Sequence, residues 1–388
     1  MEKMIDNSRP IKIGFITNSL DYLDKETNPI GTVRYYYNLI NELLKNKNLD
    51  ISLIHFSDKD LDIYKKTHNI VIKPWFKSFL PFEKHFKLFL RLRKLKLDAI
   101  HDPGQIEYSL PLFPFKRFQT IHDLSPIIFP RTVNLRMLIG NFSIIPLISM
   151  ESKKIFTVSQ NSKKDILKYF WWKKEKDVHF TYLGYSDKFK VSKERDKIRA
   201  LKKKYKLNKF ILAVGTLQPR KNLVRLIEAF SKIEKQFPDY NLVLMGGKGW
   251  MYSKIFEIVK KLNIEQKVKF TGFISDESLI SDFYNAADVF VYPSLYEGFG
   301  LPPLEAMACG CPVVTSDVSS LPEVVGDAAI KVNPYDIDEI AAAMGNVLSN
   351  KSLRQKMIKK GLEQCKKFSW KNCALETFKV YNEALRKK

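Results

Sequence analysis

Short apolar runs alternate with longer amphipathic stretches along the whole chain. In the first half the apolar runs have the length of strands, and helical patterns such as residues 34–44 and 163–169 separate them. The same alternation restarts at residue 210. Such alternation predicts parallel sheets joined by right-handed crossovers. The expected strands are residues 11–17, 51–56, 99–101, 118–122, 154–159, 210–216, 241–247, 268–273, 289–293, 312–316 and 329–332.

Two such series predict an α/β protein with two doubly wound domains, and 388 residues are also too many for one comfortable core. Ligands of such domains bind at the carboxyl ends of the strands. The hydrophobic periodicity gives way to a charged stretch at residues 182–197. We therefore expect domains at 1–185 and 186–369. An amphipathic helix within 370–388 is expected to pack back toward the first domain.

The apolar stretch at 137–150 is shorter than a membrane span and contains Asn141 and Pro146, so we expect a buried helix there. The first ten residues contain no apolar signal region, and four cysteines fit a reducing compartment. The sequence thus predicts a cytoplasmic protein. Cys309 and Cys311 have no second pair of ligands nearby in the sequence, so no metal site is predicted.

The chain is strongly basic, with a formal charge of +23 and a pI near 9.6. Such a charge suggests an anionic partner, which could be nucleic acid, an anionic membrane surface or a phosphorylated substrate. A proteome rich in lysine would produce the same charge without any such partner. Charge alone does not choose between these explanations.

Two cations follow one of the expected strands in the second half. Residues 214–230, VGTLQPRKNLVRLIEAF, place Arg220 and Lys221 between a strand end and a helix that begins near Asn222. Free N–H groups and the helix dipole would add to the side-chain charge, which favours an anion site. An ordinary strand-to-helix turn with solvated basic residues remains the alternative.

Two glutamates frame the segment EGFGLPPLE, residues 297–305. Gly298 and Gly300 allow the backbone to approach a ligand closely, and the Pro-Pro pair suits a first helical turn. A carboxylate accepts two hydrogen bonds, so Glu305 could hold the adjacent hydroxyls of a ribose and Glu297 a sugar hydroxyl. Both could instead be helix-start charges, or the acid and base of a glycosidase.

The segment YPSLYEGFGLPPLEAMACGCPVVTSDVSSLPEVVGDAA (292–329) resembles the donor-site signature of retaining, metal-independent, nucleotide-sugar glycosyltransferases, the glycosyl transferases group 1 family. Two glutamates separated by seven residues mark that signature. The resemblance covers nearly the whole chain and is most specific at 210–332. Further matching segments are TIHDLSPIIFP (120–130), TVSQNSKKDI (157–166), GTLQPRKNL (215–223), GGKGW (246–250) and TGFIS (271–275).

The resemblance implies the GT-B architecture, in which two Rossmann-like domains face each other across a cleft. It implies transfer of a hexose, with mannose favoured, from a nucleotide diphosphate sugar to a glycan or lipid-linked acceptor, with retention of configuration. The setting would be the synthesis of a cell-envelope polysaccharide. Neither a cofactor nor a metal is expected. Asp276 could accept hydrogen bonds from a guanine edge, which favours GDP-mannose over UDP-sugars as the donor.

The resemblance also implies roles for individual residues. Glu305 would hold the donor ribose and Glu297 a hydroxyl of the transferred sugar, while Arg220 and Lys221 would neutralise the diphosphate. His122 would reach the transferred sugar from the first domain. The remaining donor contacts would come from Gly31, Ile274, Gly298, Phe299, Gly300 and Leu301.

Four segments depart from the family pattern or add to it. The loop PIGTVRY (29–35) keeps only Gly31 where relatives have a glycine-rich stretch. Residues 81–98 place Phe82, Phe86 and Phe89 among basic residues, as a helix lying on a membrane would. A domain helix that packs its Phe side inward is the alternative, and FWWKKEK (170–176) is a second membrane candidate. DKDLD (58–62) imitates an Asp-x-Asp metal motif, but we interpret it as a solvated loop.

Four other functions are alternatives to a glycosyltransferase. A nucleotide-sugar epimerase could share the architecture, whereas a phosphorylase would need a pyridoxal lysine context that the sequence lacks. An oxidoreductase would need G-x-G-x-x-G after the first strand, and residues 16–21 do not provide it. A basic nucleic-acid-binding protein would show binding that depends steeply on salt. We expect no nucleic acid partner.

Overall fold

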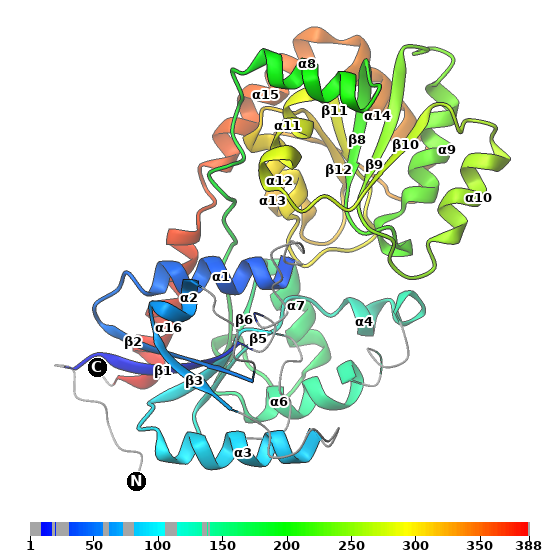
Figure 1. Ribbon diagram of the computed structural model, residues 1–388. Helices are drawn as coiled ribbons and strands as arrows, with labels where there is room; N and C mark the ends of the chain where they lie inside the picture. Colours follow the sequence, from blue (N-terminus) through cyan, green and yellow to red (C-terminus); the bar gives the residue numbers. More distant parts are fainter. Residues whose placement is uncertain are drawn as a thin grey trace. The chain divides into compact units, whose positions relative to one another are not determined.

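A computed structural model describes residues 9–17, 20, 31–56, 62–72, 81–104, 115–133, 138 and 140–386. The chain divides into two compact units (Figure 1). Unit 1 comprises Met1–Ile128, Leu135–Gly184 and Ser369–Lys388, and unit 2 comprises Phe129–Asn134 and Tyr185–Phe368. The sequence predicts domain boundaries after residues 185 and 369, each one residue from a boundary of these units. It predicts 129–134 in the first domain, whereas these residues belong to unit 2.

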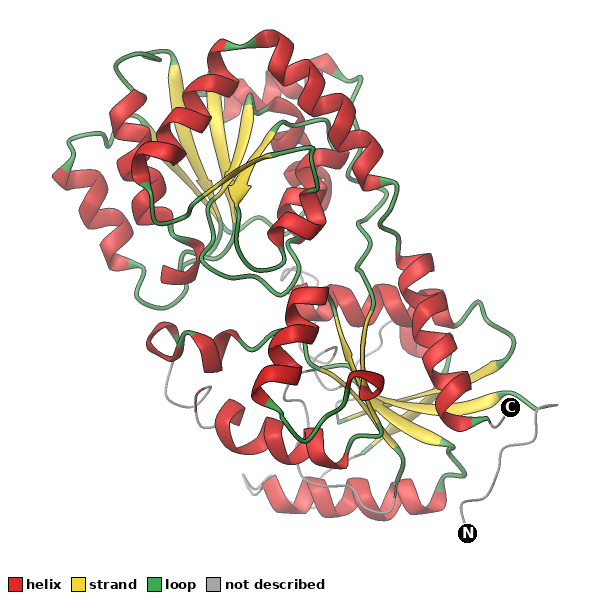
Figure 2. Cartoon of the chain, turned by 180° about the vertical axis from the view of Figure 1, so that it is seen from behind, coloured by secondary structure: helices red, strands yellow, loops and turns green. Residues whose placement is uncertain are grey.

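Unit 1 contains a seven-stranded sheet in the order β3-β2-β1-β4-β5-β6-β7, and every pairing is parallel. Helices cover both faces of this sheet (Figure 2). Its strands are β1 Ile11–Ile16, β2 Leu49–His55, β3 His68–Val71, β4 Ala99–Asp102, β5 Arg117–Thr120, β6 Lys154–Thr157 and β7 Val178–Phe180. Its main helices are α1 Gly31–Leu43, α2 Asp62–Lys65, α3 Pro81–Lys94, α4 Ser125–Ile128, α6 Ile145–Glu151, α7 Gln160–Tyr169 and α16 Trp370–Leu385.

Unit 2 repeats this plan with a six-stranded parallel sheet in the order β10-β9-β8-β11-β12-β13. Its strands are β8 Lys209–Val214, β9 Tyr240–Met245, β10 Val268–Gly272, β11 Val289–Tyr292, β12 Val313–Ser316 and β13 Ile330–Val332. Its helices are α8 Arg195–Lys204, α9 Leu223–Ile233, α10 Ser253–Lys261, α11 Glu277–Ala286, α12 Leu301–Ala308, α13 Leu321–Val325, α14 Ile337–Ser349 and α15 Lys351–Cys365, with the 3₁₀ turn η5 Pro219–Lys221.

In both sheets the strand order reverses at one position. In unit 2 this reversal determines where the candidate site lies. In unit 2 the order runs outward in opposite directions from β8 and β11, which are paired neighbours. Loops that leave such a pair at its carboxyl ends diverge and leave room for a ligand. The segments after β8 and β11 are those that carry the predicted cations and glutamates. The predicted class of two Rossmann-like doubly wound domains is therefore confirmed.

The predicted buried helix at 137–150 is only partly correct. Its described part consists of a π-helical turn, η3 Gly140–Ile144, followed by α6. Ile145 and Ile148 are buried, and Ile145 belongs to a core cluster of unit 1, but Phe142, Leu147 and Met150 are each more than half exposed. The sequence has apolar residues on all sides of this helix, so hydrophobicity alone could not show which face is buried.

Candidate functional site

The loop after β8 brings two cations to the carboxyl edge of the unit 2 sheet. The short turn η5 carries Arg220 and Lys221 and ends at Asn222, which has a left-handed backbone with φ 58°. The side chain of Asn222 donates hydrogen bonds to the carbonyls of Pro293 (3.0 Å) and Pro334 (2.6 Å). This residue therefore ties the β8 loop to the segment after β11. A left-handed non-glycine residue costs about 1 kcal/mol or more, and functional sites often contain such strain.

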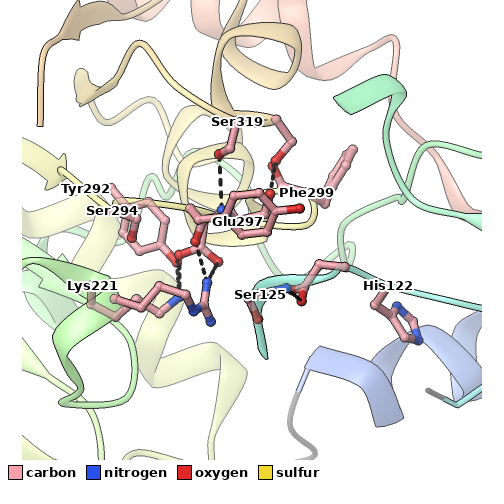
Figure 3. Close-up of polar contacts among 12 residues, drawn as sticks. His122, Ser125, Lys221, Tyr292, Ser294, Glu297, Phe299 and Ser319 are labelled. Carbon is pink, nitrogen blue, oxygen red and sulfur yellow. Dashed lines mark hydrogen bonds and ion pairs between the residues drawn. The ribbon is translucent and has the colours of Figure 1, made fainter. Parts of the chain in front are cut away.

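Both cations form ion pairs with Glu297, and Figure 3 shows Lys221 beside this carboxylate. The Arg220 Nη1 atom lies 2.8 Å from Glu297 Oε2, and the Lys221 Nζ atom lies 2.6 Å from Oε1. The Tyr292 hydroxyl donates to the same Oε1 at 3.0 Å. We call Arg220, Lys221 and Glu297 the ion cluster. Sequence reasoning selected all three residues, and the structure brings them together.

The cluster is nearly buried, so its electrostatics are strong. Burial alone would raise the pKa of Glu297, but the charges of Arg220 and Lys221 outweigh burial and lower the pKa to about 2. Glu297 is therefore ionised at neutral pH. An ionised carboxylate accepts hydrogen bonds and donates none. Glu297 consequently fits an electrostatic or orienting role and does not fit the general acid of a glycosidase.

Serines from the loop after β12 fix the backbone around Glu297. The Glu297 amide donates to Ser319 Oγ at 3.1 Å, and the Ser320 hydroxyl donates to the carbonyl of Phe299 at 2.6 Å. Ser319 has a left-handed backbone with φ 56°. Sequence reasoning missed both serines, and it also missed Tyr292. Only their position inside the family signature could have indicated them.

The predicted helix start at the Pro-Pro pair is correct. Gly300 precedes α12 with φ 117°, a left-handed backbone conformation that favours glycine. Glu305 lies in α12, is buried, and accepts a hydrogen bond from the Tyr284 hydroxyl at 3.2 Å. Leu301 begins α12, and Gly298 and Phe299 are buried just before it.

The other predicted donor residues of unit 2 lie after β10. Ile274 is half-buried, and Asp276 is exposed and caps α11, because its Oδ1 accepts from the Ser278 amide at 2.9 Å. The structure gives neither residue a contact with the ion cluster among the interactions that it describes. Because it caps α11, Asp276 has a structural role at the N-terminus of that helix.

Gly31 and His122 belong to unit 1. Gly31 is the first residue of α1 and is exposed. His122 follows β5, and its Nε2–H donates to the Pro103 carbonyl at 3.0 Å while the ring edge contacts Tyr35. Because burial disfavours the charged ring, the pKa of His122 falls to about 4. The imidazole is therefore neutral at pH 7, with its proton on Nε2.

A buried polar network surrounds this histidine. His101 bonds to the Tyr381 hydroxyl through Nδ1 and to Thr120 Oγ1 through Nε2 (2.9 Å), and the Tyr35 hydroxyl lies 3.2 Å from the same Thr120 oxygen. Burial lowers the pKa of His101 to about 3. We call His101, Thr120, Tyr35 and Tyr381 the histidine network. Tyr381 belongs to α16, so the C-terminal helix is part of unit 1.

Within the described ranges, no group of three or more His, Cys, Asp or Glu side chains is arranged to hold a metal ion. Of DKDLD (58–62), which is interpreted as a solvated loop, only Asp62 lies within the described residues. Pro29 and Ile30 of the PIGTVRY loop also lie outside them. None of the helices that the structure describes has the length and apolarity needed to cross a membrane.

Residues 194–364 match the family described as Glycosyl transferases group 1. The chain is 39% identical over 237 residues to the O-antigen chain mannosyltransferase B of Escherichia coli, with 60% of this chain and 61% of that protein covered. It is 31% identical over 271 residues to the serotype-specific mannosyltransferase WbdA of Escherichia coli, with 67% and 32% covered. The chain thus spans about three fifths of the first relative and one third of the second.

Solved structures share the fold over almost the whole chain. Sucrose-phosphate synthase from Thermosynechococcus elongatus superposes with a TM-score of 0.75 at 22% identity, with 96% of this chain and 98% of that chain covered. Anabaena Alr3699/HepE in complex with UDP-glucose gives 0.74 at 19% identity, with 96% and 99% covered. The fold class is that of the GT-B glycosyltransferases. The chain carries a domain of the Glycosyl transferases group 1 family, and that domain contains the ion cluster.

Proposed function

We propose that this chain is a retaining, metal-independent glycosyltransferase that transfers a hexose, with mannose favoured, from a nucleotide diphosphate sugar. The acceptor is a glycan or a lipid-linked glycan in cell-envelope polysaccharide synthesis. The observation that carries the proposal is the ion cluster at the β8/β11 reversal, inside the matched domain. Relatives named as O-antigen and serotype-specific mannosyltransferases support the sugar and the pathway class.

Arg220 and Lys221 hold the diphosphate leaving group in this proposal. The ion cluster has two positive charges and one negative charge. It therefore offers a net charge of +1 to an anion bound at the loop that follows β8. Negative charge grows on the diphosphate as the glycosidic bond breaks, and fixed cations stabilise that growth more than they stabilise the bound donor. The departing phosphate then accepts the proton of the acceptor hydroxyl on the same face, and no protein nucleophile is assigned.

The carboxylate of Glu297 can accept one further hydrogen bond, from a hydroxyl of the transferred sugar. Each carboxylate oxygen has about two acceptor positions. Oε1 accepts from Lys221 and Tyr292, whereas Oε2 accepts from Arg220 alone among the contacts that the structure describes. The second position of Oε2 is therefore assigned to a sugar hydroxyl.

Glu305 is assigned to the donor ribose, because its buried carboxylate lies about one helical turn into α12, where the Tyr284 hydroxyl donates to Oε2 at 3.2 Å. Backbone groups of residues 298–301 would contact sugar and phosphate, and the backbone at Ile274 the nucleobase. Asp276 caps α11 through Oδ1, which leaves Oδ2 to accept from a guanine edge. From unit 1, His122 is assigned to the transferred sugar and Gly31 to the phosphate.

A peripheral location at an anionic membrane is also proposed, through α3. Phe86 (54% exposed) and Leu90 (38% exposed) lie four residues apart and point outward, whereas Leu88 and Leu92 are buried. Lys87, Arg91 and Lys94 follow the same helix face. The exposed Phe86 opposes the alternative in which all Phe residues face inward. The side chains of Phe82 and Lys84 lie outside the described residues.

A donor panel tests the proposal. GDP, UDP and ADP are added separately, thermal unfolding is followed, and transfer is then measured with GDP-mannose and UDP-glucose in the presence of EDTA. Binding to the folded state raises the unfolding temperature by mass action. We expect stabilisation by one nucleoside diphosphate, GDP before UDP, and transfer from the matching sugar donor. Absence of stabilisation by any of them would contradict the assignment.

A further inference from the structure

Two residues at the start of α9 depart from the usual chemistry of a helix N-terminus. Asn222 occupies the N-cap position, but within the first turn, all of which the structure describes, its side chain makes no capping hydrogen bond. Arg225 lies in that first turn, although the positive end of a helix dipole disfavours a cation there. Neither side chain supports the helix start in the usual way, and the structure gives both of them other partners.

Arg225 bonds to the side chain of Asn222. Its Nη1 atom donates to Asn222 Oδ1 at 2.9 Å, and its guanidinium carbon lies 5.3 Å from the centre of the Tyr335 ring. Tyr335 follows Pro334, whose carbonyl accepts a hydrogen bond from Asn222 Nδ2 at 2.6 Å. Arg225 therefore holds both Asn222 and the residue next to the acceptor of Asn222, in the loop after β13. We call Arg225, Asn222 and Tyr335 the Arg225 clamp.

The clamp adjoins the turn that carries the two cations of the ion cluster. Asn222 is the buried, left-handed residue that ends η5, directly after Arg220 and Lys221. Its Nδ2 also donates to the Pro293 carbonyl at 3.0 Å, and the Leu295 amide donates to the Arg220 carbonyl at 2.9 Å. These bonds fasten the turn to the segment after β11, which also carries the carboxylate of the ion cluster. The position of both cations thus depends on the Asn222 side chain.

Charge alone does not explain the presence of an arginine at position 225. A third positive charge in this part of unit 2 would attract an anion, but a lysine would provide that charge equally well. The contacts of Arg225 use what arginine has and lysine lacks, which is a planar group that donates a directed hydrogen bond while it lies over an aromatic ring. These contacts indicate positioning.

We propose that Arg225 positions the two cations of the ion cluster by acting through Asn222. Arg225 keeps the Asn222 side chain directed at its two carbonyl acceptors, and Asn222 in turn keeps the left-handed turn on the segment after β11. In this role Arg225 acts without touching the donor. The inference rests on the proposed function for what the cations do, which is to hold a diphosphate.

A double-mutant cycle tests whether Arg225 acts through Asn222. Arg225→Met keeps an unbranched side chain but loses the hydrogen bond and the charge, and Asn222→Gly keeps the left-handed backbone but loses the side chain. Turnover is measured at saturating GDP-mannose or UDP-glucose, whichever the natural chain uses. We expect Arg225→Met to lower turnover about tenfold in the natural chain and less than about twofold in Asn222→Gly, because residues that share one interaction are not additive. Equal factors in the two backgrounds would overturn the proposal.

A conservative variant separates position from charge. Arg225→Lys keeps the charge but not the planar group, so its turnover should stay at least about fivefold below that of the natural chain. Full turnover of Arg225→Lys would show that charge alone matters and would overturn the proposal. The matched control is Arg199→Met on α8, which removes an exposed arginine that pairs with Asp196 at 3.4 Å and should leave turnover unchanged.

Hydrogen exchange follows the turn without relying on the reaction. The Leu295 amide is the reporter, since its hydrogen bond to the Arg220 carbonyl lasts only while the turn lies on this segment. We expect faster exchange of this amide in Arg225→Met and in Asn222→Gly, and unchanged exchange in Arg199→Met. Exchange in Arg225→Met at the rate of the natural chain would contradict the positioning role. If Asn222→Gly does not fold, Arg225→Lys and the exchange of Arg225→Met decide the question.

GDP and UDP affinities, measured on every variant, separate this inference from the proposed function. If the natural chain binds neither nucleotide but the Leu295 amide exchanges faster in Arg225→Met, the clamp holds the turn and only the proposed function is wrong. If the natural chain binds and transfers while Arg225→Met behaves like it in every measurement, only the positioning inference is wrong.

Discussion

The carboxyl edge of the unit 2 sheet holds a carboxylate between two cations, whereas the corresponding edge of the unit 1 sheet holds neutral histidines on hydrogen bonds. Both regions are largely buried, and in both burial is the largest single influence on the pKa of the central group. In unit 2 the neighbouring charges reverse that influence and lower the pKa of Glu297. In unit 1 the Pro103 carbonyl and Asp123 oppose burial only weakly at His122, and at His101 the nearby charges lower the pKa further, so both rings stay neutral.

This difference indicates that unit 2 provides fixed charges for a ligand, whereas unit 1 provides neutral polar groups. A fixed positive excess in unit 2 can meet a diphosphate without first rearranging water, which is the usual basis of electrostatic stabilisation in enzymes. A neutral imidazole that donates from Nε2 to Pro103 can orient a sugar hydroxyl without adding charge. Substitutions in the ion cluster and in the histidine network should therefore have different effects.

The largest effect is expected from the cations. Lys221→Ala removes a charge that the proposed function assigns to the departing diphosphate, so turnover at saturating donor should fall by about 10²–10³-fold. Arg220→Ala should behave similarly. The matched control is Lys232→Ala, which breaks an exposed ion pair with Asp338 in the same unit and should leave turnover unchanged. Unchanged turnover in Lys221→Ala would mean that the leaving-group role is wrong.

Acid unfolding separates the two regions by pH. The pKa values of His122 (about 4) and His101 (about 3) lie below the ordinary 6.5, so the unfolded chain binds protons that the folded chain does not. Stability should therefore fall as the pH decreases from 6.5 toward 3. The Glu297 pKa, about 2 against an ordinary 4.5, adds a loss only below pH 4.5.

Denaturant unfolding at a series of pH values measures these windows. His122→Gln keeps a donor near the Nε2 position but does not titrate, so it should remove about 3 kcal/mol of the pH dependence between 6.5 and 4. Glu297→Gln should leave that window unchanged. A flattened upper window in Glu297→Gln would show that the assignment of the two titrations is reversed.

A smaller effect is expected from the histidine network. Tyr381→Phe removes the hydroxyl that bonds to His101 and should lower the free energy of unfolding by roughly 1–2 kcal/mol. Nucleoside diphosphate binding should not change, because the network belongs to unit 1. Tyr37→Phe on α1, whose ring is exposed, is the control and should cost almost nothing. Loss of nucleotide affinity in Tyr381→Phe would show that the network supports the donor site.

The smallest expected effect is that of metal removal. Two cations already face the assigned diphosphate position, so transfer should continue at full rate after dialysis against EDTA. Rates are compared before and after adding Mg²⁺ or Mn²⁺. Complete loss with EDTA and recovery with a divalent ion would reject the metal-independent proposal.

Much of the fold follows from the sequence because most strands are long apolar runs. The strands that were not expected, β3 and β7, are the two edges of the unit 1 sheet. β3 begins with exposed His68 and Asn69, and β7 has three residues, of which only Val178 is buried. Edge strands need fewer apolar side chains, so their hydrophobic pattern is short and weak. In contrast, the helix expected within 370–388 is found as α16 Trp370–Leu385, because its amphipathic period is sustained.

For the site, the sequence identified the charged side chains but not the residues that hold them. Strand ends and turn residues marked the positions of Arg220, Lys221 and Glu297, and the strand order then brought them together. The bonds of Asn222 to Pro293 and Pro334 join segments more than 70 residues apart, and local pattern cannot show them. Likewise, the sequence shows Tyr292 only as a strand residue, and the hydrogen bond from its hydroxyl to Glu297 is known only from the structure.

The division of labour between the two glutamates is the central claim, and sugar-free nucleotide affinity tests it most directly. Glu305→Gln keeps size but loses a charge-assisted hydrogen bond to the ribose, so affinity for the nucleoside diphosphate should fall by an amount equivalent to roughly 1.5–3 kcal/mol. Glu297→Gln removes a carboxylate that is paired with both cations, so the same affinity should stay constant or increase, while turnover falls. Calorimetric titration of both variants with GDP and UDP measures this difference. Equal loss of affinity in the two variants would contradict the account.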